Sequence, residues 1–272
     1  MFDDLLRASA ALLHDISVQV QDVRHNEPAP GSVWRRETAL DATVGDEGFP
    51  VPYSFAHHVH RTLNYAAAER LETLSWCVQP GFPQILSAID LARAAAETAS
   101  LAAWLGRPEA DGEARLRRLM YMVQRADGEQ RGLQTALGVE LSSSSKGILD
   151  WAGRRRLRAE RYPSREALLA AVDEDAGSIH YKRLSSFTHG NLDAMMALYI
   201  EIEQAQKGDS RLLEVHALSV ATVATSYMLG GLASLVRITG IGQPELAALD
   251  ERAEKLEEAL EWAAEQVPDL AR

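Results

Sequence analysis

The sequence predicts an all-α protein, folded as a single helical bundle of about seven to eight helices with a long irregular loop near residues 24–52. Composition is the first reason, because alanine, leucine, glutamate and arginine are abundant and only 6% of the residues are aromatic. Those abundant residues favour helices, whereas strands favour β-branched and aromatic side chains. Periodicity is the second reason, because apolar residues recur at three- and four-residue steps along most of the chain. The sequence contains no internal repeat and no set of strand-like segments.

The chain divides into two parts at about residue 52. Residues 1–52 are expected to form an N-terminal helix, over residues 2–23, and the irregular loop, both packed on the bundle. Prolines and glycines crowd this loop and favour an irregular path. Residues 53–272 are expected to form the helical bundle domain. Its expected helices cover residues 53–78, 83–105, 112–138, 164–171, 181–189, 192–207, 212–239 and 244–266.

Charge and cysteine content bound the class of function. The net charge of −11 argues against a general nucleic-acid-binding surface and leaves room only for a local basic groove. The single cysteine, Cys77, excludes an internal disulfide and a cysteine-based metal cluster within one chain. The acidic, amphipathic N-terminus is unlike a secretory signal, so we expect a cytoplasmic protein. Residues 215–236 carry no Asp, Glu, Lys or Arg, but polar residues and glycines dilute them, which favours a buried helix over a membrane span.

The segment from Tyr181 to Gly190 has the strongest appearance of a site. It places Arg183 and His189 six residues apart, about one and two-thirds helical turns. An arginine that holds an anion, beside a histidine that titrates near neutral pH, is a minimal set for acid–base or phosphate chemistry. Ser185 and Ser186 lie between them.

A polar stripe on the helix expected over residues 83–105 is the second indication. Asp90, Arg93, Glu97 and Ser100 recur at three- and four-residue steps on an otherwise apolar helix. Charges on such a helix are costly to bury unless they are paired. Arg93 and Glu97 can therefore pair with each other, or serve a polar pocket shared with Arg183 and His189. A solvated stripe on a half-exposed helix is the alternative.

These two stretches together resemble a known group of proteins. Arg93-x-x-x-Glu97 followed by Tyr-x-x-Leu-Ser-x-x-x-His-Gly over residues 181–190 resembles uncharacterised helical bacterial domains that look like relatives of the HEPN superfamily (higher eukaryotes and prokaryotes nucleotide-binding). The resemblance covers roughly residues 85–205. It implies a metal-independent ribonuclease, or a toxin- or defence-type nucleic-acid protein, that works as a homodimer. Arg183 and His189 would be the catalytic Arg-x(5)-His pair, and Glu97 the acidic residue of an earlier helix.

The ribonuclease interpretation assigns a role to each residue. Arg183 would neutralise the phosphate, and His189 would move the proton of the 2′-hydroxyl or of the leaving oxygen. The substrate-binding residues would be Arg93, Tyr181, Ser185, Ser186 and Asp90. RNA would bind through the basic region from Arg154 to Arg165, unless these arginines form ordinary solvated helix faces. No metal or other cofactor is expected.

Two further classes of function remain open. A small-molecule-binding protein or enzyme would use an acid–base pocket in the bundle, with Arg93 or Arg183 on a carboxylate or phosphate and His189 or Glu97 as the proton carrier. The negative net charge favours such a small anionic ligand over RNA. A catalytically silent interaction module is the third possibility.

Three histidines cluster near the start of the helix expected over residues 53–78. They are His57, His58 and His60. Histidines three residues apart can bind a transition metal, but helical metal sites usually add Glu-x-x-His pairs, and the sequence has none. We therefore expect a polar helix end that lines a cleft.

Overall fold

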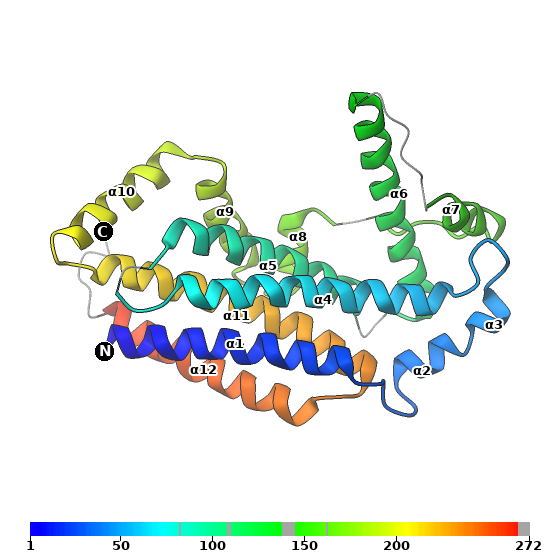
Figure 1. Ribbon diagram of the computed structural model, residues 1–272, viewed down its shortest axis with the longest axis horizontal. Coiled ribbons are helices and arrows are strands. Elements are labelled where there is room, and N and C mark those ends of the chain that lie inside the picture. Colours follow the sequence, from blue (N-terminus) through cyan, green and yellow to red (C-terminus); the bar gives the residue numbers. More distant parts are fainter. Residues whose placement is uncertain (82, 108–109, 138–144, 162, 266–272) are drawn as a thin grey trace.

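The computed structural model describes residues 1–81, 83–107, 110–137, 145–161 and 163–265. In chain order the helices are α1 (Phe2–His25), α2 (Val33–Thr38), α3 (Asp41–Val44), α4 (Pro52–Cys77), α5 (Ile85–Leu105), α6 (Gly112–Leu137), α7 (Ser145–Arg154), α8 (Arg165–Ala170), α9 (Gly177–Thr188), α10 (Leu192–Gln206), α11 (Arg211–Thr239) and α12 (Gln243–Glu265). Figure 1 shows their arrangement. The described ranges contain no strand beyond an isolated bridge between Asp46 and Phe49, so the predicted all-α class is confirmed.

The helices outnumber the predicted seven to eight. The excess comes partly from α2 and α3, which lie inside the segment predicted to be an irregular loop. Each is too short to show helical periodicity, but α2 has a local start signal, because the Ser32 side chain accepts a hydrogen bond from the backbone of Arg35. Gly138 and Gln266, which the predicted helix bounds included, lie outside the described residues.

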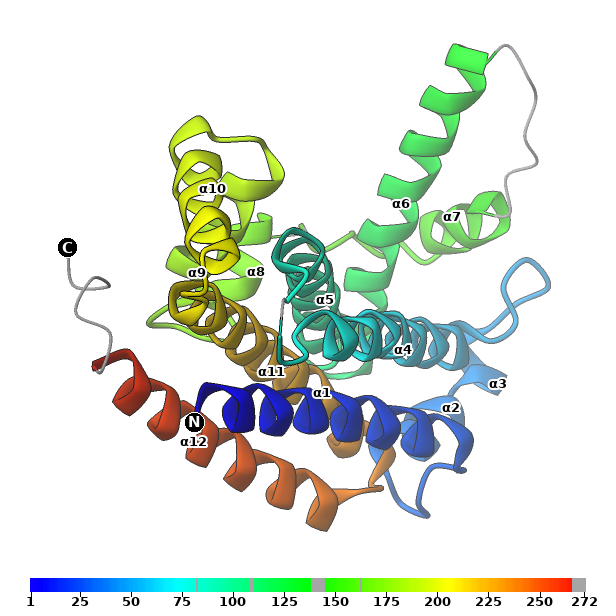
Figure 2. The same cartoon turned by 60° about the vertical axis from the view of Figure 1, so that its left-hand side comes forward.

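Helix α11 is the centre of the main bundle. It packs on α5, α1, α12 and α4, and Figures 1 and 2 show α1, α4, α5 and α12 grouped around it. Within the described ranges, α11 is the one helix apolar and long enough to cross a membrane, yet 72% of its most apolar window is buried inside the protein. Its apolar character is therefore that of a core helix.

Small residues allow α4, α5 and α11 to approach closely. A Cβ on Gly231 of α11 would lie 2.8 Å from Asn64 Oδ1 on α4 and 3.2 Å from Ala99 Cβ on α5. Ala92, Ala96 and Ala99 of α5 are fully buried in the same core. The three helices can therefore pack with backbones near one another, which larger side chains would prevent.

A second, smaller core lies at the N-terminal end of α4. Phe49, Tyr53, Leu116, Met120 and Trp151 join the loop after α3 to α4, α6 and α7. Figures 1 and 2 show that α6 rises away from the bundle beside α7, whereas α9 and α10 lie toward the opposite end of the long axis. The two ends of the molecule thus carry separate groups of helices.

Candidate functional site

Helix α9 carries most of the residues that the sequence predicts for the site. Its first residue, Gly177, lies so close to α8 that a Cβ there would be 2.5 Å from the backbone nitrogen of Ala170. In the middle of the helix, Leu184 is buried in the main core. The helix ends at His189, whose backbone N–H donates to the Ser185 carbonyl at 3.0 Å. These contacts direct one side of α9 toward α5 and another toward α10 and α11.

Four of the predicted residues meet on the side toward α5. Arg93 Nε donates a hydrogen bond to Glu97 Oε1 at 2.8 Å, and its guanidinium carbon lies 5.7 Å from the centre of the Tyr181 ring. Asp90 Oδ1 accepts a hydrogen bond from Thr188 Oγ1 at 3.1 Å. Arg93 is only 7% exposed, so its charge is neutralised by Glu97 inside the contact between the two helices. The polar stripe therefore joins α5 to α9.

Arg183 lies on the other side of α9. Its Nη1 donates a hydrogen bond to Ser219 Oγ of α11 at 3.0 Å. Together with Ser186 it lines an open cleft of about 330 Å³ between α9, α10 and the start of α11. Apolar side chains form part of the wall, including Phe187 and Val215. The cleft thus combines one guanidinium with a partly apolar surface.

The same cleft contains a histidine and a carboxylate. His216 Nδ1 of α11 lies 3.0 Å from Glu201 Oε2 of α10, and the histidine is 8% exposed. A carboxylate accepts hydrogen bonds, so this contact places the proton of a neutral imidazole on Nδ1 and leaves Nε2 as an acceptor. The Phe187 ring lies 5.3 Å from the imidazole, centre to centre. The pair is a held acid–base group beside Arg183.

Desolvation and a neighbouring charge shift the pKa of Arg183 in opposite directions. Desolvation by the surrounding protein lowers the pKa of its guanidinium, and the nearby carboxylate of Glu201 partly counteracts this shift. Within the described residues, no carboxylate oxygen lies within 4.0 Å of Arg183. Its positive charge therefore lies near the protein surface, without an ion-pair partner among the described residues.

The remaining predicted residues lie apart from both groups. His189 is exposed at the end of α9, and its side chain has no hydrogen-bond partner within the described part of the chain. Ser185 is half-buried and is not among the residues that line the Arg183 cleft. The structure therefore brings Arg93, Glu97 and Tyr181 together, and Asp90 joins the same pair of helices through Thr188. It places Arg183 and Ser186 in a different cleft and leaves His189 outside both.

Sequence reasoning did not find His216 and Glu201. His216 lies at the start of the uncharged stretch that predicts a buried helix, where a histidine is more often a core residue than a site residue. Glu201 lies on a different helix, 15 residues earlier. Because the contact depends on how α10 folds back onto α11, no spacing within one helix indicates it.

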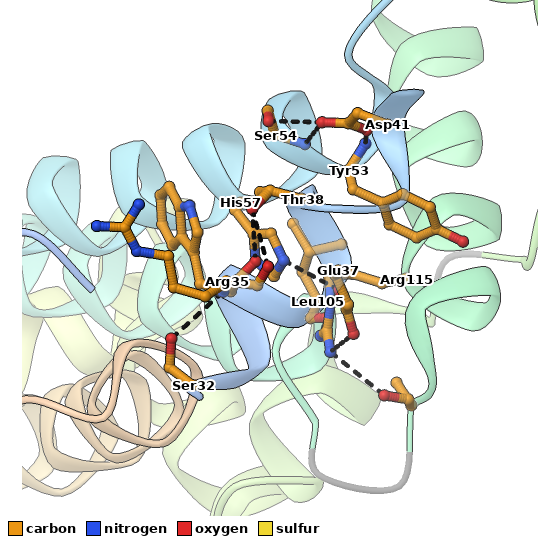
Figure 3. Close-up of polar contacts among 12 residues, drawn as sticks. Ser32, Arg35, Glu37, Thr38, Asp41, Tyr53, Ser54, His57, Leu105 and Arg115 are labelled. Carbon is orange, nitrogen blue, oxygen red and sulfur yellow. Dashed lines mark hydrogen bonds and ion pairs between the residues drawn. The ribbon is translucent and has the colours of Figure 1, made fainter. Parts of the chain in front are cut away.

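A second polar centre is buried where α2 meets α4 and α6. Glu37 accepts hydrogen bonds from Arg115 Nε at 3.0 Å and from Arg115 Nη2 at 3.2 Å, as Figure 3 shows. Arg115 Nη1 also donates to the Leu105 carbonyl at 2.8 Å. On α3, Asp41 accepts hydrogen bonds from the backbone of Tyr53 at 2.7 Å and thereby caps α4. These contacts anchor α2 and α3 to the bundle.

The three clustered histidines belong to this region and have different surroundings. His57 Nε2 lies 3.0 Å from Glu37 Oε2, although the angle is poor for a hydrogen bond, and its ring stacks on Trp34 at 4.9 Å. His60 is fully buried, with Nε2 2.8 Å from Ser234 Oγ. His58 is exposed. Within the described ranges, no group of three or more His, Cys, Asp or Glu side chains is placed to hold a metal ion.

Burial controls the titration of this polar centre. It lowers the pKa of His57, where the contact with Glu37 opposes the shift only in part. It lowers the pKa of His60 well below its ordinary value, and the positive charge of Arg115 adds to that effect. Burial alone would raise the pKa of Glu37, but the close contact with His57 and the hydrogen bonds and charge of Arg115 lower it. The centre therefore favours neutral histidines beside an ionised glutamate.

The basic region from Arg154 to Arg165 is partly neutralised. Arg154 Nη2 lies 2.8 Å from Asp46 Oδ2, and Arg165 Nε lies 3.4 Å from Glu97 Oε2. The exposed arginines without a side-chain partner in the described part of the chain are Arg156, Arg158 and Arg161. The region is thus a mixture of paired and free cations.

Comparisons of the chain with protein-family models, with curated proteins and with solved structures each give no match. A function for this protein must therefore be inferred from the geometry and charge of its own residues. The Arg183 cleft and the α5–α9 contact are the parts of that geometry closest to the predicted site.

Proposed function

We propose that this protein binds a small anionic molecule in the Arg183 cleft. The observation that carries the proposal is the state of Arg183. Its side chain is exposed on the wall of the cleft, it donates to a neutral hydroxyl on Ser219, and it has no carboxylate partner within 4.0 Å in the described part of the chain. A carboxylate or phosphate would supply the missing counter-charge and would accept two parallel hydrogen bonds from the guanidinium.

The size and walls of the cleft suit a small ligand. Its volume of about 330 Å³ is at the lower end of ordinary ligand pockets. Phe187, Leu212 and Val215 offer apolar contact to the body of the ligand, while the Arg183 guanidinium takes the anion. The ligand that fits best is therefore a monoanion with a short apolar or aromatic part.

The His216–Glu201 pair gives this cleft a means to move a proton. Glu201 Oε2 lies 3.0 Å from His216 Nδ1 and orients the imidazole. A histidine held in this way beside an anion-binding arginine can act as a general base or acid on a bound molecule. Proton transfer to or from the anchored ligand is the reaction type that the proposal allows.

Binding can be tested by isothermal titration calorimetry with inorganic phosphate and with benzoate. We expect saturable binding to the wild-type protein and an affinity about tenfold or more lower in Arg183→Ala, because a charge-assisted hydrogen bond is lost. Lys182→Ala is the matched control, since Lys182 is an exposed neighbour that contacts Glu166 and does not line the cleft. Failure of both anions to bind, or equal losses in the two variants, would contradict the proposal.

A metal-independent ribonuclease that works as a homodimer is the second candidate. Its support is the exposure of His189, whose free side chain at the end of α9 remains available to a phosphate held by Arg183 of a second copy. Exposed apolar residues on the neighbouring α10 offer a surface for that second copy, and they are Leu192, Met196, Tyr199 and Ile200.

The ribonuclease candidate has a direct test. The wild-type protein is incubated with RNA in EDTA beside Arg183→Ala and His189→Ala, and its mass in solution is measured by light scattering. Cleavage that is lost in both variants, by a dimeric wild-type protein, is the expected result. Intact RNA with the wild type, or equal cleavage by the variants, would rule the candidate out.

A further inference from the structure

A cleft of about 430 Å³ at the other end of the molecule is lined by four arginines. It lies between α6 and the chain that leaves α7, and Arg117, Arg155, Arg156 and Arg158 line it. The carboxylate that lines it is Glu113. This concentration of positive charge stands out in a chain whose net charge is −11. The cleft shares no lining residue with the Arg183 cleft.

The end of α7 has a defined backbone geometry that places these arginines. The N–H of Leu157 donates to the Ala152 carbonyl at 3.0 Å, and the N–H of Arg156 donates to the Gly153 carbonyl at 3.1 Å. These two hydrogen bonds form a Schellman motif, in which the residue after the cap adopts a left-handed conformation. Here that residue is Arg156, with φ of 54°.

Glycine is the usual residue at this position, because a side chain in the left-handed region meets its own backbone. Arg156 is the non-glycine residue with positive φ in the described part of the chain. A cation near the carboxyl end of a helix is favourable, but Arg154 and Arg155 already provide it without this strain. An unfavourable conformation that persists indicates a role for the side chain that occupies it.

The arginines of the cleft are incompletely paired. Arg117 makes an exposed ion pair with Glu113 at 3.1 Å, and such pairs hold their partners weakly. Among the described residues, Arg155 has a long hydrogen bond of 3.4 Å to the Thr43 carbonyl and a ring contact with Trp151. Arg156 and Arg158 have no side-chain partner in the described ranges. At least two guanidinium groups are thus free to take an external anion.

The segment after α7 is held firmly enough to keep these groups together. The N–H of Glu160 donates to the Arg117 carbonyl at 3.0 Å, so the chain that carries Arg158 runs along α6. The Glu160 carboxylate accepts a hydrogen bond from Arg118 Nε at 2.8 Å. The cleft is therefore bounded by fixed backbone, which limits the entropy lost when a ligand orders the arginines.

We propose that the cleft between α6 and α7 is a binding site for a small oligophosphate, meaning two or more linked phosphate groups. Several guanidinium groups within one small cleft match several adjacent phosphates, each of which can accept two hydrogen bonds. A volume of about 430 Å³ accommodates an inorganic polyphosphate or the phosphates of a nucleotide. A long nucleic acid is favoured less than a small oligophosphate, because the chain as a whole has a net charge of −11 and a nucleic acid would extend beyond the cleft.

The probe is sodium tripolyphosphate, titrated into the full chain by calorimetry in EDTA at 0.15 M salt, with orthophosphate, citrate, ATP and a 20-nucleotide single-stranded RNA as further arms. We expect one tripolyphosphate per chain, bound at least tenfold more tightly than orthophosphate or citrate. Arg158→Ala should lower the affinity about tenfold or more. Arg161→Ala is the matched control, because Arg161 is exposed and free on the same segment but lies outside the cleft. Arg161→Ala should change the affinity less than twofold.

Arg156→Gly tests the strained position separately. This variant should lower tripolyphosphate affinity while raising the Tm by about 2–4 °C, because glycine relieves the left-handed backbone. Equal affinity for ATP and tripolyphosphate would indicate that the phosphates alone are recognised, and tighter binding of ATP would extend the site to the nucleoside. The proposal is overturned by an absence of saturable tripolyphosphate binding, by equal losses in Arg158→Ala and Arg161→Ala, or by RNA that binds more tightly than tripolyphosphate.

Discussion

The carboxylate of Glu37 and the guanidinium of Arg115, 78 residues apart in the chain, form a two-point ion pair with distances of 3.0 and 3.2 Å. Arg115 is 2% exposed and Glu37 is 9% exposed, so both charges have left water and depend on each other. Through this pair, the short helix α2 is fixed to α6, and the segment before α4 becomes part of the bundle.

Removal of one partner of this pair should be strongly destabilising. Glu37→Gln leaves the Arg115 charge buried without a counter-ion, and we expect the free energy of unfolding to fall by about 3–5 kcal/mol. Urea denaturation followed by circular dichroism measures this change. The double variant Glu37→Met/Arg115→Met should lose less than the sum of the single variants, since both charges are then absent. Additive losses would contradict the coupling.

Stability should fall as the pH drops below about 6.5. Burial lowers the pKa values of His57 and His60 in the folded state below the ordinary value of 6.5. The unfolded chain then binds more protons than the folded protein, so the free energy of unfolding decreases toward acid pH, by up to about 1.4 kcal/mol per pH unit for each histidine. Below 4.5, protonation of Glu37 adds a further loss, because its folded pKa is lowered from that value.

Urea denaturation at several pH values between 5.0 and 8.0 tests this dependence. His60→Gln should make the slope shallower, whereas His58→Gln, at an exposed position, should leave it unchanged. A stability that stays constant from pH 8.0 to 5.0 would show that the buried histidines do not control it.

Two glycines within helices should respond in opposite ways to alanine. A Cβ on Gly231 would meet Asn64 Oδ1 at 2.8 Å, so Gly231→Ala should cost about 1–3 kcal/mol through overpacking. A Cβ on Gly128 of α6 would meet nothing within 4 Å, so Gly128→Ala should stabilise the protein by about 0.5–1 kcal/mol. Thermal unfolding of both variants provides the comparison. A stabilising Gly231→Ala would show that α4 and α11 can move apart at no cost.

Loss of the Glu97 carboxylate should lower the stability more than loss of Arg165, the second arginine beside it. In Glu97→Gln the nearly buried Arg93 loses its counter-charge, and we expect a loss of about 1–3 kcal/mol. Arg165, at 3.4 Å from Glu97, is about half exposed, so Arg165→Ala should cost no more than about 1 kcal/mol. Denaturation of the two variants should therefore differ clearly. Equal losses would place the importance of Glu97 in its contact with Arg165.

The long helices could be predicted from the sequence because apolar residues recur at helical spacing within each of them. The segment predicted over residues 192–207 is α10 (Leu192–Gln206), and the one predicted over 212–239 is α11 (Arg211–Thr239). The helices α2 and α3 carry no such signal. They are stabilised by contacts to distant residues, such as Glu37 with Arg115. The surrounding segment is rich in glycine and proline, so its sequence predicts a loop.

The sites were predictable only as far as they lie within one helix. The spacing of Arg93 and Glu97 indicates a pair, and that pair forms at 2.8 Å. Arg183 lies in α9 and His189 directly follows the last residue of that helix, and a spacing of six residues directs their side chains to different sides. The approach of His216 and Glu201 to the Arg183 cleft depends on the turn between α10 and α11, which determines their distance and cannot be read from spacing.

The position of α11 at the centre of the bundle also governs the order in which the protein can fold. Helix α1 is synthesised well before α11 and α12, yet it packs on both of them. Helices α1, α4 and α5 can pack on one another earlier, but the apolar surface that each buries against α11 stays uncovered until α11 has left the ribosome. Contacts between such distant segments slow folding and leave apolar surface open to aggregation. Production of this protein should accordingly depend on chaperones more than its all-helical fold suggests, and truncation before residue 211 should leave an incomplete core.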